Sequence, residues 1–158
     1  NTMHEAAHLL AFNSGLQSRE HGQPVWYSEG IATSFETINP AKPFGPGKVN
    51  PVRFKHFKEA AQAGRLMEID ELVAVRNAGD LDEGKRHVLY AQSWALYHYL
   101  FRHRTAGLRK FGELVNAAPP GYRSQEQFRE MFVEAFGPTD GLQEEMVESV
   151  LEEDKRDH

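Results

Sequence analysis

Apolar side chains recur along most of this chain with the spacing of helices rather than with the alternation of strands. The densest pattern covers residues 85–103, where apolar residues occupy more than half of the helix circumference, so we expect a central buried helix there. The segment 66–75 fits either a short strand or a helix capped by Asp70. Further helices, separated by Pro and Gly residues, are predicted at about residues 51–63, 106–117, 124–136 and 140–154. We therefore expect a mainly α fold with very few strands.

Two more helices are predicted at the start of the chain, before a loop rich in Pro and Gly. The first covers about residues 3–14, and Thr2 and Glu5 have the spacing of a capping box at its beginning. The second begins at Ser28, its predicted N-cap, and reaches about Ile38, which is followed by an Asn-Pro pair.

Composition narrows the class of protein. The chain has 158 residues, of which 40% are hydrophobic, enough for the core of a single domain. The net charge of −5 argues against a nucleic-acid binder, and no apolar run approaches the roughly 18 residues of a membrane span. The absence of cysteine excludes disulfides, thiolate metal ligands, iron–sulfur clusters and cysteine nucleophiles. The composition does not select a cellular compartment, because cysteine-free chains suit oxidising and reducing spaces alike. A secreted or cell-envelope location is among the alternatives.

The motif His-Glu-Ala-Ala-His at residues 4–8 carries the main chemical signal. On a helix, His4 and His8 lie one above the other on the same face, so both imidazoles can reach one metal ion. Glu5 points close to the same ion and can act on a metal-bound water without ligating the metal. Zinc favours this arrangement, because it accepts nitrogen and oxygen ligands. The simpler alternatives are two surface histidines, and for Glu5 the capping partner of Thr2.

Glu29 is the candidate for the third protein ligand that a catalytic zinc site requires. It would lie in the first turn of the second helix, and the connection from His8 leaves room for this helix to fold back. The small residues Gly30 and Ala32 would let two helices approach within ligand distance. Glu36, seven residues further on, would accept a hydrogen bond from the free N–H of a ligand imidazole. The alternatives are a helix-dipole role for Glu29 and a solvent-facing position for Glu36.

The string from His4 to His8 and the block from Trp26 to Glu36 resemble the gluzincin zinc metallopeptidases, above all the aminopeptidase branch and its relatives in the peptidase MA-like superfamily. In that branch a His-Glu-x-x-His helix is followed by a helix that opens with Asn/Ser-Glu-Gly-x-Ala and supplies the third ligand. Here the corresponding residues are Ser28, Glu29, Gly30, Ile31 and Ala32.

The resemblance extends to the helix over residues 85–103. The segment that begins at Tyr90 is similar to the tyrosine-led helix of the aminopeptidase branch, whose tyrosine steadies the transition-state oxyanion. Gln92 and Ser93 stand where that branch usually has Lys-Gly after the tyrosine. The alternative for Tyr90 is a core aromatic on a buried helix. His87, three residues earlier, could also reach the active-site cleft that the resemblance implies.

The resemblance implies that this chain is the helical C-terminal part of a zincin (thermolysin-like) catalytic domain, whose upstream β-sheet would be absent. We therefore expect residues 1–158 to form a single, truncated gluzincin-like metallopeptidase domain. Its expected parts are the zinc-site helices at 1–38, the central helix bearing Tyr90 at 85–103 and the C-terminal helices at 104–158.

The function that the resemblance implies is zinc-dependent hydrolysis of a peptide bond. One Zn²⁺ ion would be held by His4, His8 and Glu29, with Glu5 as the general base and Tyr90 as the oxyanion donor. The substrate would be a peptide or protein, with endopeptidase and aminopeptidase activity both open, as is the oligomeric state. One alternative is a catalytically inactive, zinc-stabilised helical binding or structural domain. A second is a helical interaction module with an accidental motif and no metal.

The remaining histidines and acidic residues fit ordinary structural roles. The acidic stretch from Glu144 to Asp154 is expected to be the solvated face of the last helix. Five histidines have no ligand spacing and are expected on the surface or in the core: His21, His56, His98, His103 and His158.

Overall fold

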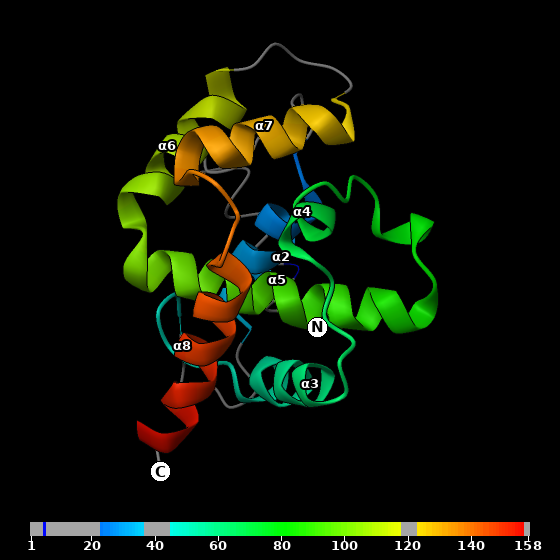
Figure 1. The fold of residues 1–158 in the computed structure, drawn as a ribbon, viewed down its shortest axis with the longest axis vertical. Coiled ribbons are helices and arrows are strands. Elements are labelled where there is room, and N and C mark those ends of the chain that lie inside the picture. Colours follow the sequence, from blue (N-terminus) through cyan, green and yellow to red (C-terminus); the bar gives the residue numbers. More distant parts are fainter. Residues whose placement is uncertain (1–4, 6–22, 37–44, 118–122, 157–158) are drawn as a thin grey trace.

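The computed structural model describes residue 5, residues 23–36, 45–117 and 123–156 (Figure 1). In this part the chain is helical and has no strand, which confirms the predicted mainly α fold. The helices in chain order are α2 (Val25–Ser34), α3 (Pro51–Gln62), α4 (Ile69–Leu72), the 3₁₀ turn η1 (Ala78–Asp80), α5 (Glu83–His103), α6 (Thr105–Ala117), α7 (Gln125–Phe136) and α8 (Leu142–Arg156).

Helix α5 is the central element, as the sequence predicts. It contacts α2, α3, α6, α8 and η1, and eleven of its 21 residues are buried, among them Leu89, Trp94 and Leu100. In Figure 1, α3 lies on one side of α5 and the pair of α6 and α7 lies on the other. A helix that is apolar over most of its circumference needs neighbours on several sides, and α5 has them.

Local signals at the helix ends explain why most boundaries agree with the predicted ones to within two residues. The Asn50 side chain caps α3 by accepting a hydrogen bond from the Arg53 N–H at 3.2 Å, and Pro51 occupies the first helical position. Asp82 caps α5 in the same way. Ser124 forms a capping box at the start of α7.

Two predicted helix starts are wrong. Helix α2 begins at Val25 rather than at Ser28, because the Val25 N–H bonds the Val75 carbonyl at 3.1 Å and Trp26 is fully buried. The ambiguous segment 66–75 contains the short helix α4, and its N-cap is Glu68 rather than Asp70. In both cases contacts with distant parts of the chain decide the start.

An aromatic cluster joins the N-terminal and C-terminal parts of the described chain. Trp26 on α2 packs against four rings, with centroid distances of 5.1 to 6.4 Å: Tyr27, Phe111, Phe132 and Phe136. These rings belong to one core cluster that runs from Trp26 to Val150. Edge-to-face and tilted ring pairs of this kind add to the free energy of burial. Helix α2 is therefore anchored against α6 and α7 as well as against α5.

Membrane insertion through a long apolar helix has no support among the described residues, since none of their helices combines the necessary length and hydropathy.

Candidate functional site

Glu29, the predicted third zinc ligand, lies on α2. Because α2 begins at Val25, Glu29 is the fifth residue of the helix and lies in its second turn, not in the predicted first turn. Its side chain is half-buried, and the carboxylate oxygen Oε2 is shielded from solvent.

The next residue, Gly30, sets the distance between α2 and α5. A methyl group added at Gly30 would lie 2.6 Å from the Tyr97 Cβ and 3.1 Å from the Ser93 carbonyl oxygen, both on α5. Only glycine permits this approach. The structure thus shows Gly30 admitting α5, whereas the predicted approach of α2 to the helix of the zinc motif stays a prediction, because that helix lies outside the described residues. Glu29 is fixed relative to α5 by the residue beside it.

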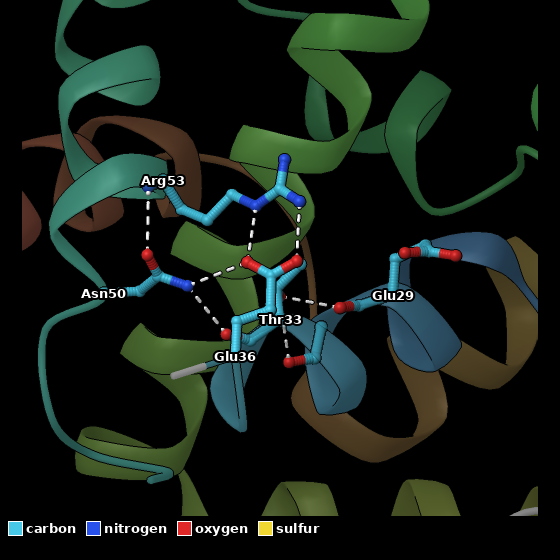
Figure 2. A network of polar contacts seen from close by, with 6 residues as sticks. Glu29, Thr33, Glu36, Asn50 and Arg53 are labelled. Carbon is cyan, nitrogen blue, oxygen red and sulfur yellow. Dashed lines mark hydrogen bonds and ion pairs between the residues drawn. The ribbon is translucent and has the colours of Figure 1, made fainter. Parts of the chain in front are cut away.

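Glu36, the predicted partner of a ligand imidazole, lies beyond the end of α2. The helix ends at Ser34, where the Ser34 and Thr33 hydroxyls donate to the carbonyl of Gly30, one turn earlier. The predicted helix end near Ile38 is therefore wrong, and Glu36 does not continue the helix that carries Glu29. In Figure 2 the Glu29 carboxylate lies apart from that of Glu36.

Glu36 is a buried residue, 5% exposed, and its carboxylate forms a bidentate ion pair with Arg53 of α3 (Figure 2). The Arg53 Nη2 donates to Oε1 at 2.7 Å and Nε donates to Oε2 at 2.9 Å. The buried Asn50 amide donates to Oε2 at 3.0 Å and to the Thr33 carbonyl at 2.9 Å. This network ties the end of α2 to the start of α3. The predicted bond from Glu36 to an imidazole stays a prediction, because His4 and His8 lie outside the described residues.

Tyr90 is half-buried on α5, one turn before the contact between Ser93 and Gly30. The guanidinium carbon of Arg53 lies 5.9 Å from the centre of the Tyr90 ring, within the range of a cation–π contact. Tyr90 is thus part of the interface between α3 and α5, but it is not enclosed by the core.

His87 and His56 form a second contact between α5 and α3, with ring centroids 4.4 Å apart. Burial lowers the pKa of His56 below its ordinary value, and the nearby charges of His87, Arg53 and Lys55 lower this pKa further, whereas that of Glu59 raises it. His56 is therefore predominantly neutral at pH 7. Both histidines lie within one helical turn of the Arg53 and Tyr90 pair along their helices.

Of the residues in the zinc motif, the structure describes only Glu5, which is helical and exposed. His4 and His8 lie outside the described residues, as does Thr2, so neither the metal site nor the capping box is tested. Among the residues that are described, no group of three or more His, Asp or Glu side chains could hold a metal ion. A zinc site that includes Glu29 would thus need ligands from outside the described residues.

The acidic stretch of the last helix is not wholly solvated, contrary to prediction. Glu153 of α8 is 7% exposed, and its carboxylate lies 2.6 Å from the His98 Nε2 and 3.0 Å from the Arg102 Nε, both on α5. His98 is buried and stacks on Trp94, so it is one of the expected core histidines. Burial lowers the pKa of His98, while Glu153 acts in the opposite direction.

Sequence reasoning did not identify Arg53 or Asn50 as parts of the network around Glu36. One local signal was available for Asn50, since Asn before Pro at a helix start is a typical N-cap. No such signal exists for Arg53, because its partners Glu36 and Tyr90 are 17 and 37 residues away in the sequence. Only the packing of α2, α3 and α5 brings the three side chains together.

Comparison with known proteins gives one match. Neither the curated proteins nor the solved structures contain a chain that matches this one. A family model matches residues 1–120, a segment that includes His4, Glu5, His8, Glu29 and Tyr90. Because this match covers more than half of the sequence, the chain belongs to the protein family described as DUF1570, a protein of unknown function.

Proposed function

We propose that this chain is a gluzincin-type zinc peptidase that hydrolyses peptide bonds in a peptide or protein substrate. One observation carries the proposal: the His-Glu-x-x-His motif is followed by Glu29 on a helix that packs directly on the helix of Tyr90. The close approach at Gly30 supports it, because a third ligand and an oxyanion donor must be held at a fixed separation. The family match spans all of these residues.

The donor set fits zinc. Two imidazoles four residues apart and one carboxylate from a second helix are the ligand types that catalytic zinc sites use, with the fourth position left for water or substrate. Glu29 has the properties of such a ligand, since its side chain is half-buried and its Oε2 is shielded from bulk water. A zinc ion at this position would polarise the scissile carbonyl and lower the pKa of water to about 7.

Glu5 and Tyr90 have separate roles in the hydrolysis. Glu5 accepts a proton from the attacking water, so that a carbon–oxygen bond forms at the scissile carbonyl. Glu5 delivers this proton to the amide nitrogen as the carbon–nitrogen bond breaks, which releases an amine and a carboxylic acid. Tyr90 donates a hydrogen bond to the oxyanion that develops on the carbonyl oxygen. The exposure of Glu5 is compatible with exchange of protons with water.

The test compares zinc content and hydrolysis in matched variants. We expect the purified wild-type chain to hold one zinc ion and to cleave members of a peptide library. Glu29→Ala should weaken zinc binding more than about 100-fold, since even the residues that only orient a ligand contribute about 10–100-fold. Glu130→Ala, which removes an exposed carboxylate from α7, is the control and should keep both properties.

The outcomes separate the three hypotheses. Zinc binding without hydrolysis of any peptide would favour a zinc-stabilised binding or structural domain. A wild-type chain that holds no zinc would leave only the helical interaction module. Equal zinc content in Glu29→Ala and Glu130→Ala would remove Glu29 from the ligand set.

A further inference from the structure

Arg53 occupies a position between the end of α2 and the Tyr90 ring on α5. Two of its nitrogens are fixed on the Glu36 carboxylate at 2.7 and 2.9 Å, and its guanidinium carbon lies 5.9 Å from the centre of the Tyr90 ring. The Arg53 side chain is 20% exposed and that of Glu36 is 7% exposed, so water competes weakly for this pair. The cation is thus held against the aromatic ring by a second contact.

The position of Arg53 is determined from several sides. Its own backbone N–H donates to the Asn50 side chain, which caps α3. The Asn50 amide in turn donates to Glu36 and to the Thr33 carbonyl near the end of α2. Asn50 has no exposed surface. Three hydrogen bonds converge on the Glu36 carboxylate, two of them from Arg53, and they leave the guanidinium little freedom to move.

We propose that Arg53 is a positioning residue for Tyr90, and that Glu36 holds Arg53 in place against the tyrosine ring. The inference rests on the proposed function, in which Tyr90 donates to the oxyanion. A cation on the ring face favours one ring orientation and so directs the hydroxyl. It also couples the orientation of Tyr90 to α2, the helix that carries Glu29. The two halves of the proposed site would therefore be aligned through Arg53.

The side-chain type matters for this role. The planar guanidinium can bind a carboxylate through two parallel N–H groups and present its charge to an aromatic ring at the same time. A lysine ammonium can make either contact as a point charge, but it lacks the two parallel N–H groups that hold a guanidinium on a carboxylate. We therefore expect Arg53→Lys to keep part of the effect and Arg53→Gln to lose it.

The kinetic test is a double-mutant cycle with Tyr90→Phe, performed on the zinc-loaded chain. The loss of a partly shielded cation–π contact corresponds to about a 3- to 30-fold change. We expect Arg53→Gln to lower kcat by this factor with KM nearly unchanged, and Arg53→Lys to lower it less. In the Tyr90→Phe background the same Arg53→Gln change should have almost no effect on kcat. The control Arg65→Gln removes an exposed arginine after α3 and should leave kcat unchanged.

A second readout does not depend on activity. The ring resonances of Tyr90, assigned by their loss in Tyr90→Phe, should shift in Arg53→Gln and stay in place in Arg65→Gln, with or without zinc. Arg53→Gln leaves the buried Glu36 carboxylate without its cation, which destabilises the fold. The double variant Glu36→Gln/Arg53→Gln removes this unpaired charge, so it tests the role of Arg53 in a folded chain. This double variant should show the same shift and the same fall in kcat.

The outcomes distinguish this inference from the proposed function. A wild-type chain that hydrolyses no peptide would overturn both. If the wild-type chain is active and the fold-changes in kcat from Arg53→Gln and Tyr90→Phe simply multiply in the double variant, only the role of Arg53 is overturned. Tyr90 resonances that do not respond to Arg53→Gln would have the same consequence.

Discussion

Gly30→Ala tests whether the close approach of α2 to α5 fixes the geometry of the proposed site. The new methyl group would lie 2.6 Å from the Tyr97 Cβ and 3.1 Å from the Ser93 carbonyl oxygen. An ordinary carbon–carbon contact is about 3.5–4.0 Å, so α2 must shift away from α5 by about 1 Å. Neither neighbouring atom is at the end of a flexible side chain, and rotamer changes cannot relieve the clash.

The expected change in the free energy of unfolding of Gly30→Ala follows from two opposing effects. Overpacking of this kind typically costs about 1–3 kcal/mol, and the higher helix propensity of alanine returns up to about 1 kcal/mol. We therefore expect Gly30→Ala to lower the free energy of unfolding by about 1–2 kcal/mol. The shift should also reduce zinc affinity, because Glu29 moves with the backbone of α2.

Urea unfolding followed by circular dichroism measures the first effect. The control is Gly84→Ala, also within a helix, where the nearest heavy atom to the added methyl is the Asp82 Oδ1 at an ordinary 3.5 Å. This control should be neutral or stabilised by up to about 1 kcal/mol, as helix propensity alone dictates. If Gly30→Ala is as stable as Gly84→Ala, α2 and α5 are not in the tight contact described, and the alignment of Glu29 with Tyr90 through Gly30 is refuted.

Three other predictions concern Tyr90, the buried contact of Glu153 on α8 with His98 on α5, and the dependence of stability on pH. Tyr90→Phe should lower kcat by about 10²–10³ with zinc content unchanged; a wild-type rate would make Tyr90 a structural residue. Glu153→Ala should lower the free energy of unfolding by about 1.5–3 kcal/mol, because the buried His98 loses its partner, whereas exposed Glu152→Ala should have little effect in the same urea titration. Because the pKa of His98 and that of His56 are lowered in the folded chain, the unfolded chain binds protons first as the pH falls below about 6.5. The urea concentration at the unfolding midpoint should therefore decrease as the pH is lowered from 7 to 5.5. His98→Gln should make this decrease smaller, and an unaltered pH dependence in that variant would exclude His98 as its source.

The parts of the fold that were predicted correctly are those with local sequence signals. Helices α3 and α7 begin at capping residues, Asn50 and Ser124, whose side chains bond the first turn. Helix α5 was predicted as central because its apolar residues cover most of its surface, and such a helix must be surrounded. These signals depend on residues within one or two turns, so they can be found in a sequence.

The start of α2 was predicted incorrectly because its cap is not local. Pro24 precedes the helix without any side-chain hydrogen bond, and the first N–H bonds the distant Val75 carbonyl. Burial of Trp26 in the aromatic cluster then extends the helix towards the N-terminus. Tertiary packing here overrides the N-cap preference of Ser28.

The candidate site shows the same division between local and long-range information. The motif at residues 4–8 and Glu29 could be proposed from spacing and chemistry, because helical periodicity relates side chains four residues apart. The ion pair of Glu36 with Arg53 and the hydrogen bond between His98 and Glu153 join separate parts of the fold across 17 and 55 residues. No periodicity relates such positions, and acidic side chains in a polar stretch look alike until the packing buries one of them.

The central claim is that Glu5 performs acid–base chemistry at a zinc site held by His4, His8 and Glu29. The most direct measurement compares zinc stoichiometry and peptide hydrolysis in the wild-type chain and in Glu5→Gln, which keeps the size of the side chain but cannot accept the proton. We predict one zinc ion per chain in both, with hydrolysis lowered in Glu5→Gln by at least about 10²-fold, the usual contribution of a general base. Hydrolysis at the wild-type rate in Glu5→Gln, or no zinc in the wild-type chain, would contradict the account.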